Sequence, residues 1–246
     1  MRRILFQWRG YTVWSYPAML YLGLVAGVVA GNFAAHALGI IAFAVFVATL
    51  ILIPLAIASA RLLYVAAHWQ QHYRDAPGRI WNRDEGGMAM YGGMPVMLLF
   101  SIPLLSALGL SFGAFWDAAS LTVMTGMVFT KIGCLMNGCC VGRPSSSRIA
   151  VTLPDSRGNW AKRIPVQGLE AGWAALVLAV AMVLLGRMPF QGALFLTVAA
   201  LYGVGRLMLE STREREPGAG RIALGQAASV VTVGVAIAIL AVKWPN

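Results

Sequence analysis

Three charged residues between positions 206 and 213 have the types and the spacing of an anion-binding site. Arg206 and Glu210 are four residues apart and therefore share one face of a helix, and Arg213 follows three residues later. A guanidinium group can hold a phosphate with two parallel hydrogen bonds, and a nearby carboxylate can orient it. Charged side chains at a membrane-helix end can also simply reach toward water. Because three charges form one ladder here, we favour a functional role.

A second polar group occupies residues 131–144. It combines the cations Lys131 and Arg143 with the amide of Asn137 and with several glycines, among them Gly142. Glycine allows a ligand to approach the backbone closely, and its exposed N–H group can donate to an anion. This composition also indicates an anion site.

The same segment contains all three cysteines of the chain, Cys134, Cys139 and Cys140. Zinc sites usually draw on a further pair of ligands elsewhere, and none of the three histidines is close in the sequence. Metal binding and thiol–disulfide exchange are therefore alternatives that we do not favour. We expect small packing residues, and we expect no metal or other cofactor.

A third group surrounds Tyr91, which lies between two glycine pairs in the stretch 85–93. Gly92 and Gly93 would let a ligand approach the backbone. The Tyr91 hydroxyl could donate to a phosphate or act as a general acid or base. The alternative is helix packing through small residues, with the tyrosine at the membrane interface.

Four further polar residues lie in or beside apolar segments: Arg61, Asp117, Gln167 and Glu170. Glu170 needs a cationic partner in such surroundings, and Lys131, Arg143 or Arg206 could supply it. Asp117 lies apart from these groups, and we expect it at the membrane interface.

The segments that must position these residues have the composition of membrane helices. Of 246 residues, 59% are hydrophobic and 11% are charged, whereas soluble domains carry about 25% charged residues. A helix needs roughly 20 mostly apolar residues to cross the hydrocarbon core. In the third such segment, Pro95 and Pro103 predict irregular backbone. Seven segments qualify: 16–36, 40–63, 88–108, 114–136, 166–186, 190–209 and 222–242.

These segments predict an all-α integral membrane protein with about seven transmembrane helices around a lipid-binding cavity. Residues 1–246 would form a single transmembrane domain, with polar loops at about 64–87, 137–165 and 210–221. The net charge of +10 does not indicate nucleic-acid binding, because the basic residues lie in short loops and suit anionic lipid headgroups. Of 19 basic residues, 17 lie on the side of the N-terminus, which the positive-inside rule places in the cytoplasm.

Six stretches, in the same order, resemble motifs of the prolipoprotein diacylglyceryl transferase family. They are residues 16–23, 60–62, 85–93, 130–142, 164–170 and 202–210. The resemblance implies seven transmembrane helices and transfer of diacylglyceryl from phosphatidylglycerol to the cysteine thiol of a lipobox. It also implies that glycerol phosphate is released and that no metal is needed.

The chain departs from the family motifs at several positions. Tyr91 replaces a histidine, and Lys131 replaces an arginine. Cys134 replaces an asparagine, Cys139 a glutamate and Ile164 a second histidine. Lysine keeps the charge but loses the bidentate fork, and tyrosine is a much weaker base at neutral pH. The residues that hold the lipid are kept, whereas those that handle the acceptor are changed.

The chain is therefore expected to be a transferase that moves a diacylglyceryl group from phosphatidylglycerol, or a similar lipid, to an acceptor such as a prolipoprotein cysteine. The expected catalytic residues are Tyr91, Arg206 and Glu210. The expected substrate-binding residues are Arg61, Gly92, Gly93, Lys131, Asn137, Gly142, Arg143, Gln167, Glu170 and Arg213.

Three alternatives stay open: a transferase with a non-lipoprotein acceptor, a non-catalytic lipid-binding membrane protein, and a thiol redox enzyme. The expected location is the bacterial inner (cytoplasmic) membrane. The resemblance implies that the N-terminus and the site face the periplasm, opposite to the charge rule, and we favour the orientation of the family.

Overall fold

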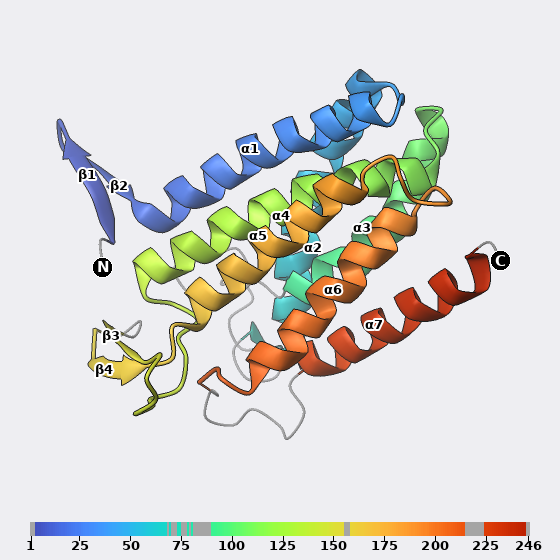
Figure 1. Cartoon of the computed structure of the whole chain (residues 1–246). Helices are drawn as coiled ribbons and strands as arrows, with labels where there is room; N and C mark the ends of the chain where they lie inside the picture. Colours follow the sequence, from blue (N-terminus) through green and yellow to red (C-terminus); the bar gives the residue numbers. More distant parts are fainter. Residues whose placement is uncertain are drawn as a thin grey trace. The chain divides into compact units, whose positions relative to one another are not determined.

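A computed structural model describes residues 3–67, 69, 73, 74, 78, 80, 90–154, 158–214 and 224–244. Within them the chain forms seven long α-helices and two short β-hairpins (Figure 1). The helices are α1 (Ser15–Ala37), α2 (Ala42–Ala67), α3 (Met90–Ala107), α4 (Phe112–Asn137), α5 (Val166–Leu184), α6 (Ala193–Glu210) and α7 (Leu224–Lys243). The strands are β1 (Ile4–Trp8), β2 (Tyr11–Trp14), β3 (Val151–Pro154) and β4 (Trp160–Arg163).

Each of the seven predicted spans coincides with one helix to within a few residues, which confirms the predicted fold class. Among the described residues, six helices are long and apolar enough to cross a membrane, and α3 contains a shorter apolar stretch, Gly93–Ala107. The chain is therefore a multi-pass membrane protein. The prediction of irregular backbone in α3 is wrong, because the helix continues through Pro95 and Pro103. Proline is tolerated in membrane helices, where local adjustments and neighbouring groups satisfy the backbone atoms that it leaves unpaired.

The contacts divide the chain into two units, which are described separately. The larger unit comprises Met1–Ile40 and Gly113–Asn246, and the smaller one Ile41–Phe112. The larger unit contains α1, α4, α5, α6, α7 and both hairpins, and within it α6 packs between α5 and α7 (Figure 1). The smaller unit consists mainly of α2 packed on α3.

A row of glycines brings α1 close to α4 within the larger unit. A Cβ atom on Gly27 would lie 2.7 Å from the Thr122 carbonyl oxygen, and one on Gly23 would lie 2.8 Å from Cβ of Phe129. A Cβ on Gly31 would collide with the Thr122 hydroxyl. Small residues at four-residue spacing allow this close approach in membranes, and it holds the helix that carries Lys131.

The N-terminal hairpin joins the start of α1 to the end of α4. The backbone carbonyl of Arg3 accepts hydrogen bonds from the Ser15 N–H and hydroxyl groups, at 2.8 and 2.9 Å. Nε of Arg3 donates to the carbonyl of Asn137 at 3.1 Å. Asn137 is the last residue of α4, so this bond satisfies a carbonyl that a helix leaves unpaired.

Asp117 has a structural role within the larger unit, and its position at the membrane interface stays a prediction. It is buried in α4, where its carboxylate accepts the backbone N–H groups of Gly192 at 2.7 Å and Phe195 at 2.9 Å. The first N–H groups of a helix have no partner within it, and Asp117 supplies the acceptor for the start of α6.

Candidate functional site

Glu170 is the centre of a buried network of ions in the larger unit. Its Oε1 lies 2.6 Å from Nη1 of Arg206 and 3.4 Å from Nη1 of Arg213, and its Oε2 lies 2.8 Å from Nζ of Lys131. Only 3% of the Glu170 side chain is exposed. Three distant parts of the sequence therefore meet here: the C-terminal part of α4, the N-terminal part of α5, and the end of α6 with the residues that follow it.

Arg206 connects Glu170 to a second carboxylate. Its Nη2 lies 2.9 Å from Oε2 of Glu210, one helical turn further along α6. The Arg206–Glu210 part of the predicted ladder is thus confirmed, whereas Arg213 lies beyond the end of α6 and pairs with Glu170 instead. We call the five residues Lys131, Glu170, Arg206, Glu210 and Arg213 the ion cluster.

The ion cluster carries one more positive than negative charge, with three cations and two carboxylates. The side chains of Lys131 and Arg206 are only 9% and 10% exposed. An excess of positive charge among side chains in such a poorly hydrated place favours the binding of an anion. The arrangement is therefore suited to hold a phosphate.

The loop between α4 and α5 positions Arg213 by pairing with the residues that follow α6. Gly142 forms an antiparallel bridge with Arg213, and the N–H of Arg143 donates to the Thr212 carbonyl at 2.9 Å. A Cβ atom on Gly142 would collide with the Ile164 carbonyl oxygen. Glycine is needed because of this close approach, since any side chain here would displace the loop.

Gln167, in the first turn of α5, holds the turn that follows α4. The residue is fully buried, and its Nε2 donates to the backbone carbonyl of Cys139 at 2.8 Å. Its Oε1 has no hydrogen-bond partner in the part of the chain that the structure describes. Gln167 therefore fixes the cysteine-containing turn and presents a buried acceptor.

Arg163 is a site-supporting residue that the sequence analysis missed. It is buried, and its Nη1 lies 2.6 Å from Oε2 of Glu214 and 3.4 Å from the Gly142 carbonyl oxygen. Its position directly before the motif at 164–170 could have indicated a role in the site. One arginine among several in a polar loop does not stand out, however.

Arg143 was predicted as a possible partner of Glu170, but it is not one of the cations that pair with Glu170 in the described part of the chain. Its backbone connects two strands of the loop, and its side chain is exposed. Lys131 and Arg206 are the partners of Glu170, together with Arg213.

The remaining predicted site residues lie in the smaller unit. Nε of Arg61 donates to the Ile80 carbonyl at 2.9 Å, and its guanidinium lies 5.8 Å from the ring centres of Tyr64 and Tyr73. Such cation–π contacts help to fix the position of a guanidinium.

The glycine-rich motif enters α3 at Met90. Gly93 is buried, and a Cβ on it would lie 3.2 Å from the Ala56 carbonyl of α2. Tyr91 and Gly92 belong to the first turn of α3, but the Tyr91 side chain and residues 85–89 lie outside the described part of the chain.

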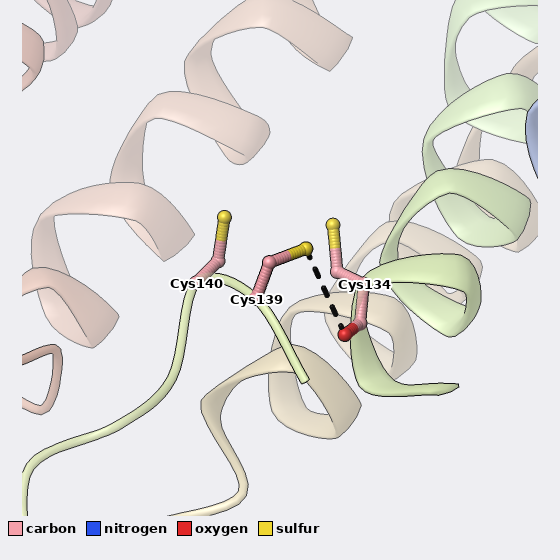
Figure 2. A group of neighbouring side chains, drawn as sticks. All are labelled: Cys134, Cys139 and Cys140. Atoms are coloured by element: carbon pink, nitrogen blue, oxygen red, sulfur yellow. Dashed lines mark hydrogen bonds between the residues drawn. The ribbon is translucent and has the colours of Figure 1, made fainter. Parts of the chain in front are cut away.

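The three cysteines gather at the end of α4. Figure 2 shows Cys134 on the helix beside Cys139 and Cys140 in the following turn, and the three Sγ atoms lie within 4.8 Å of one another. Hydrogen bonds with the other two thiols, and the charges of Arg213 and Lys131, hold the pKa of Cys140 below its ordinary value. The packing interpretation fits Cys134, which is buried, but it is wrong for Cys140, which is exposed.

Comparisons with known proteins give one consistent family. The sequence model of the prolipoprotein diacylglyceryl transferase family matches residues 3–242. A phosphatidylglycerol–prolipoprotein diacylglyceryl transferase of Bacillus mycoides is 28% identical over 255 residues, which cover 98% of this chain and 92% of the relative. The enzyme of that name from Acaryochloris marina is 28% identical over 205 residues, 77% of this chain and 70% of the relative.

Proposed function

The chain belongs to the prolipoprotein diacylglyceryl transferase family, and on this premise we propose that it transfers diacylglyceryl from phosphatidylglycerol to the cysteine thiol of a prolipoprotein. The names of its relatives supply the donor and the acceptor. The observation that carries the proposal is the ion cluster, whose excess positive charge is buried and suits a lipid phosphate.

The cations of the ion cluster bind the donor phosphate in this proposal. Lys131, Arg206 and Arg213 all face Glu170, which keeps them together before the lipid arrives. Glu210 orients the second nitrogen of Arg206. Because the cations are already in place, little reorganisation is needed when charge develops on the phosphate.

The reaction exchanges one bond of the glyceryl carbon for another. The acceptor sulfur attacks the carbon that carries the phosphate ester, a C–S bond forms, and the C–O bond to phosphate breaks. Glycerol phosphate leaves with the bonding electrons, and the thiol proton is released. Lys131, Arg206 and Arg213 stabilise the negative charge of this leaving group.

The other predicted site residues take supporting roles. Gln167 and Gly142 position the loop at the edge of the ion cluster, next to Asn137. Tyr91 is proposed to hold the headgroup or assist proton transfer.

Arg61, Gly92 and Gly93 are proposed to contact the donor lipid. The bacterial inner (cytoplasmic) membrane is the proposed location, with the N-terminus and the site facing the periplasm. The many basic residues on that side would then serve lipid phosphates rather than topology.

A different acceptor is the second candidate. Ile164 stands where the family motif has a histidine, and it is buried with its backbone against Gly142. An aliphatic side chain cannot exchange a proton, and Tyr91 is a weak base. These two positions favour a transferase whose acceptor differs from a lipobox cysteine.

Mass spectrometry of a lipobox peptide, incubated with the purified protein and phosphatidylglycerol, tests the proposal. We expect the mass of one diacylglyceryl group to be added to the peptide cysteine. Release of glycerol phosphate only in the presence of native membrane extract would support the second candidate. No release under either condition would overturn transferase activity and leave a lipid-binding protein.

A further inference from the structure

The three-cysteine group at the end of α4 has the features of a built ligand set. Cys134 lies on a helix that packs tightly against α1, and the carbonyl of Cys139 is held by Gln167 at 2.8 Å. Cys140 has φ +55, in the left-handed region that non-glycine residues seldom adopt. Such backbone persists where the surroundings impose it, and here it accompanies a third sulfur beside the other two (Figure 2).

The spacing of the sulfur atoms fits a small soft cation. In a tetrahedral zinc site with Zn–S bonds of about 2.3 Å, the sulfurs are about 3.8 Å apart. The three Sγ atoms here lie within 4.8 Å of one another. Side-chain rotations that move the sulfur atoms by about 1 Å would bring them to the spacing of a tetrahedral zinc site. Three thiolates are preferred ligands of zinc, and three protein ligands leave the fourth position open.

The charges around the thiols also suit zinc. Three thiolates and one Zn²⁺ carry a net negative charge, whereas the adjacent ion cluster carries a net positive charge. Lys131 lies one helical turn before Cys134 on α4, and Gln167 links Cys139 to the helix that bears Glu170. A zinc–thiolate group would therefore be stabilised by its neighbours.

We propose that Cys134, Cys139 and Cys140 bind one zinc ion, and that the open fourth position receives the thiol of the acceptor. The zinc site reverses our expectation of no metal, because the structure brings the three thiols together. The role of the open position rests on the proposed function and departs from the resembling family, which needs no metal; Cys134 and Cys139 stand where its motif has an asparagine and a glutamate. Zinc deprotonates a thiol that coordinates it, and the thiolate is the nucleophilic form.

The transfer step then balances without a strong protein base. The acceptor thiol loses its proton to water on binding zinc, its sulfur forms the C–S bond, and the C–O bond to phosphate breaks. Zinc remains Zn²⁺ throughout, and glycerol phosphate leaves toward the ion cluster. Tyr91 does not have to remove the thiol proton in this scheme.

Metal analysis of the purified full-length chain tests the zinc site. The protein is reduced, stripped with a chelator, loaded with zinc and freed of unbound metal. We expect about one zinc ion per chain, and loading with Co²⁺ should give intense thiolate-to-cobalt charge-transfer absorption. Cys140→Ser, which alters an exposed turn, and Cys139→Ser should each remove that absorption and most of the zinc.

His36→Ala is the matched control, because it removes an exposed alternative ligand at the end of α1. This variant should keep its zinc. Wild-type zinc content in Cys139→Ser and Cys140→Ser, or cobalt spectra without thiolate bands, would overturn the site.

A lipobox peptide then tests the open position. Adding the cysteine peptide to cobalt-loaded protein should change the charge-transfer bands, and the same peptide with serine should not. If the charge-transfer bands do not change when the cysteine peptide is added, binding of the acceptor thiol to the metal is contradicted. The metal site itself would not be contradicted by that result.

The transfer assay separates this inference from the proposed function. Removing zinc should lower transfer on the order of 100-fold, the scale of deprotonating a nucleophile, and zinc should restore it. Full transfer without zinc would overturn the catalytic role and support the proposed function. Bound zinc with no transfer at all would contradict the proposed function and leave the metal site intact.

Discussion

Nη1 of Arg206 lies 2.6 Å from Oε1 of Glu170, which joins the end of α6 to the N-terminal part of α5. The same carboxylate also pairs with Lys131 and Arg213. One acidic side chain therefore pairs with three cations, of which Lys131 lies 75 residues before Arg206 and 82 residues before Arg213 in the sequence. This relationship makes Glu170 the residue on which the geometry of the ion cluster depends.

Glu170→Gln should destabilise the protein and lower transfer. The variant leaves three buried cations facing each other without their shared counter-charge, which costs about 3 kcal/mol or more. Thermal unfolding in detergent should show a lower midpoint, and phosphatidylglycerol should raise the midpoint more than it does in wild type. An unchanged midpoint together with unchanged transfer would contradict the central role of Glu170.

Arg206→Lys and Glu210→Gln should have non-additive effects on transfer. Lysine keeps the charge but lacks the planar fork whose two nitrogens face Glu170 and Glu210, so the orienting effect of Glu210 is already lost in the lysine variant. We expect a coupling of about 1–2 kcal/mol in a double-mutant cycle on kcat/KM. Additive effects would mean that Glu210 does not act through Arg206.

Gly142→Ala should disturb the loop that holds Arg213. The new Cβ meets the Ile164 carbonyl, and such overpacking costs about 1–3 kcal/mol. Diacylglyceryl transfer should also fall, because the displaced loop no longer holds Arg213 in the ion cluster. Gly168→Ala is the matched control, because nothing lies within 4 Å of its Cβ position on α5. That variant should be as stable as wild type within about 1 kcal/mol, and equal losses in both would refute the steric argument.

Asp117→Asn should lower the stability of the protein without lowering transfer per folded molecule. Its carboxylate accepts two N–H groups at the start of α6, far along the helix from Arg206. Losing the charge should cost about 1–2 kcal/mol of stability. Transfer per folded molecule should stay at the wild-type level, and a selective loss of turnover would place Asp117 in the site.

The helices were predictable because each long apolar segment has to span the membrane, whatever its neighbours are. The Arg206–Glu210 pair was predictable for a local reason too, since residues four apart share a helix face. The partner of Glu170 was predictable only as a choice among Lys131, Arg143 and Arg206. In the structure both Lys131 and Arg206 pair with Glu170. Arg213 is a further partner, and its backbone bridge to Gly142 could not be predicted from local sequence patterns.

Asp117 and the cysteines show where local patterns are insufficient. The N–H partners of Asp117 lie about 75 residues away, so nothing near it in the sequence identifies a helix cap. Cys140 joins Cys134 and Cys139 through a turn with positive φ, and its sequence spacing does not reveal this. Tyr91, Gly92, Asn137 and the other predicted contacts of the substrate stay predictions.

The most direct test of the account compares transfer by Arg206→Ala with transfer by Arg187→Ala, using phosphatidylglycerol and a lipobox peptide. Arg187 is exposed in the turn between α5 and α6, so the control loses the same group outside the ion cluster. We predict that Arg206→Ala lowers glycerol phosphate release on the order of 100-fold or more, while Arg187→Ala keeps the wild-type rate. Equal rates in wild type and folded Arg206→Ala would contradict the claim that the ion cluster acts on the donor phosphate.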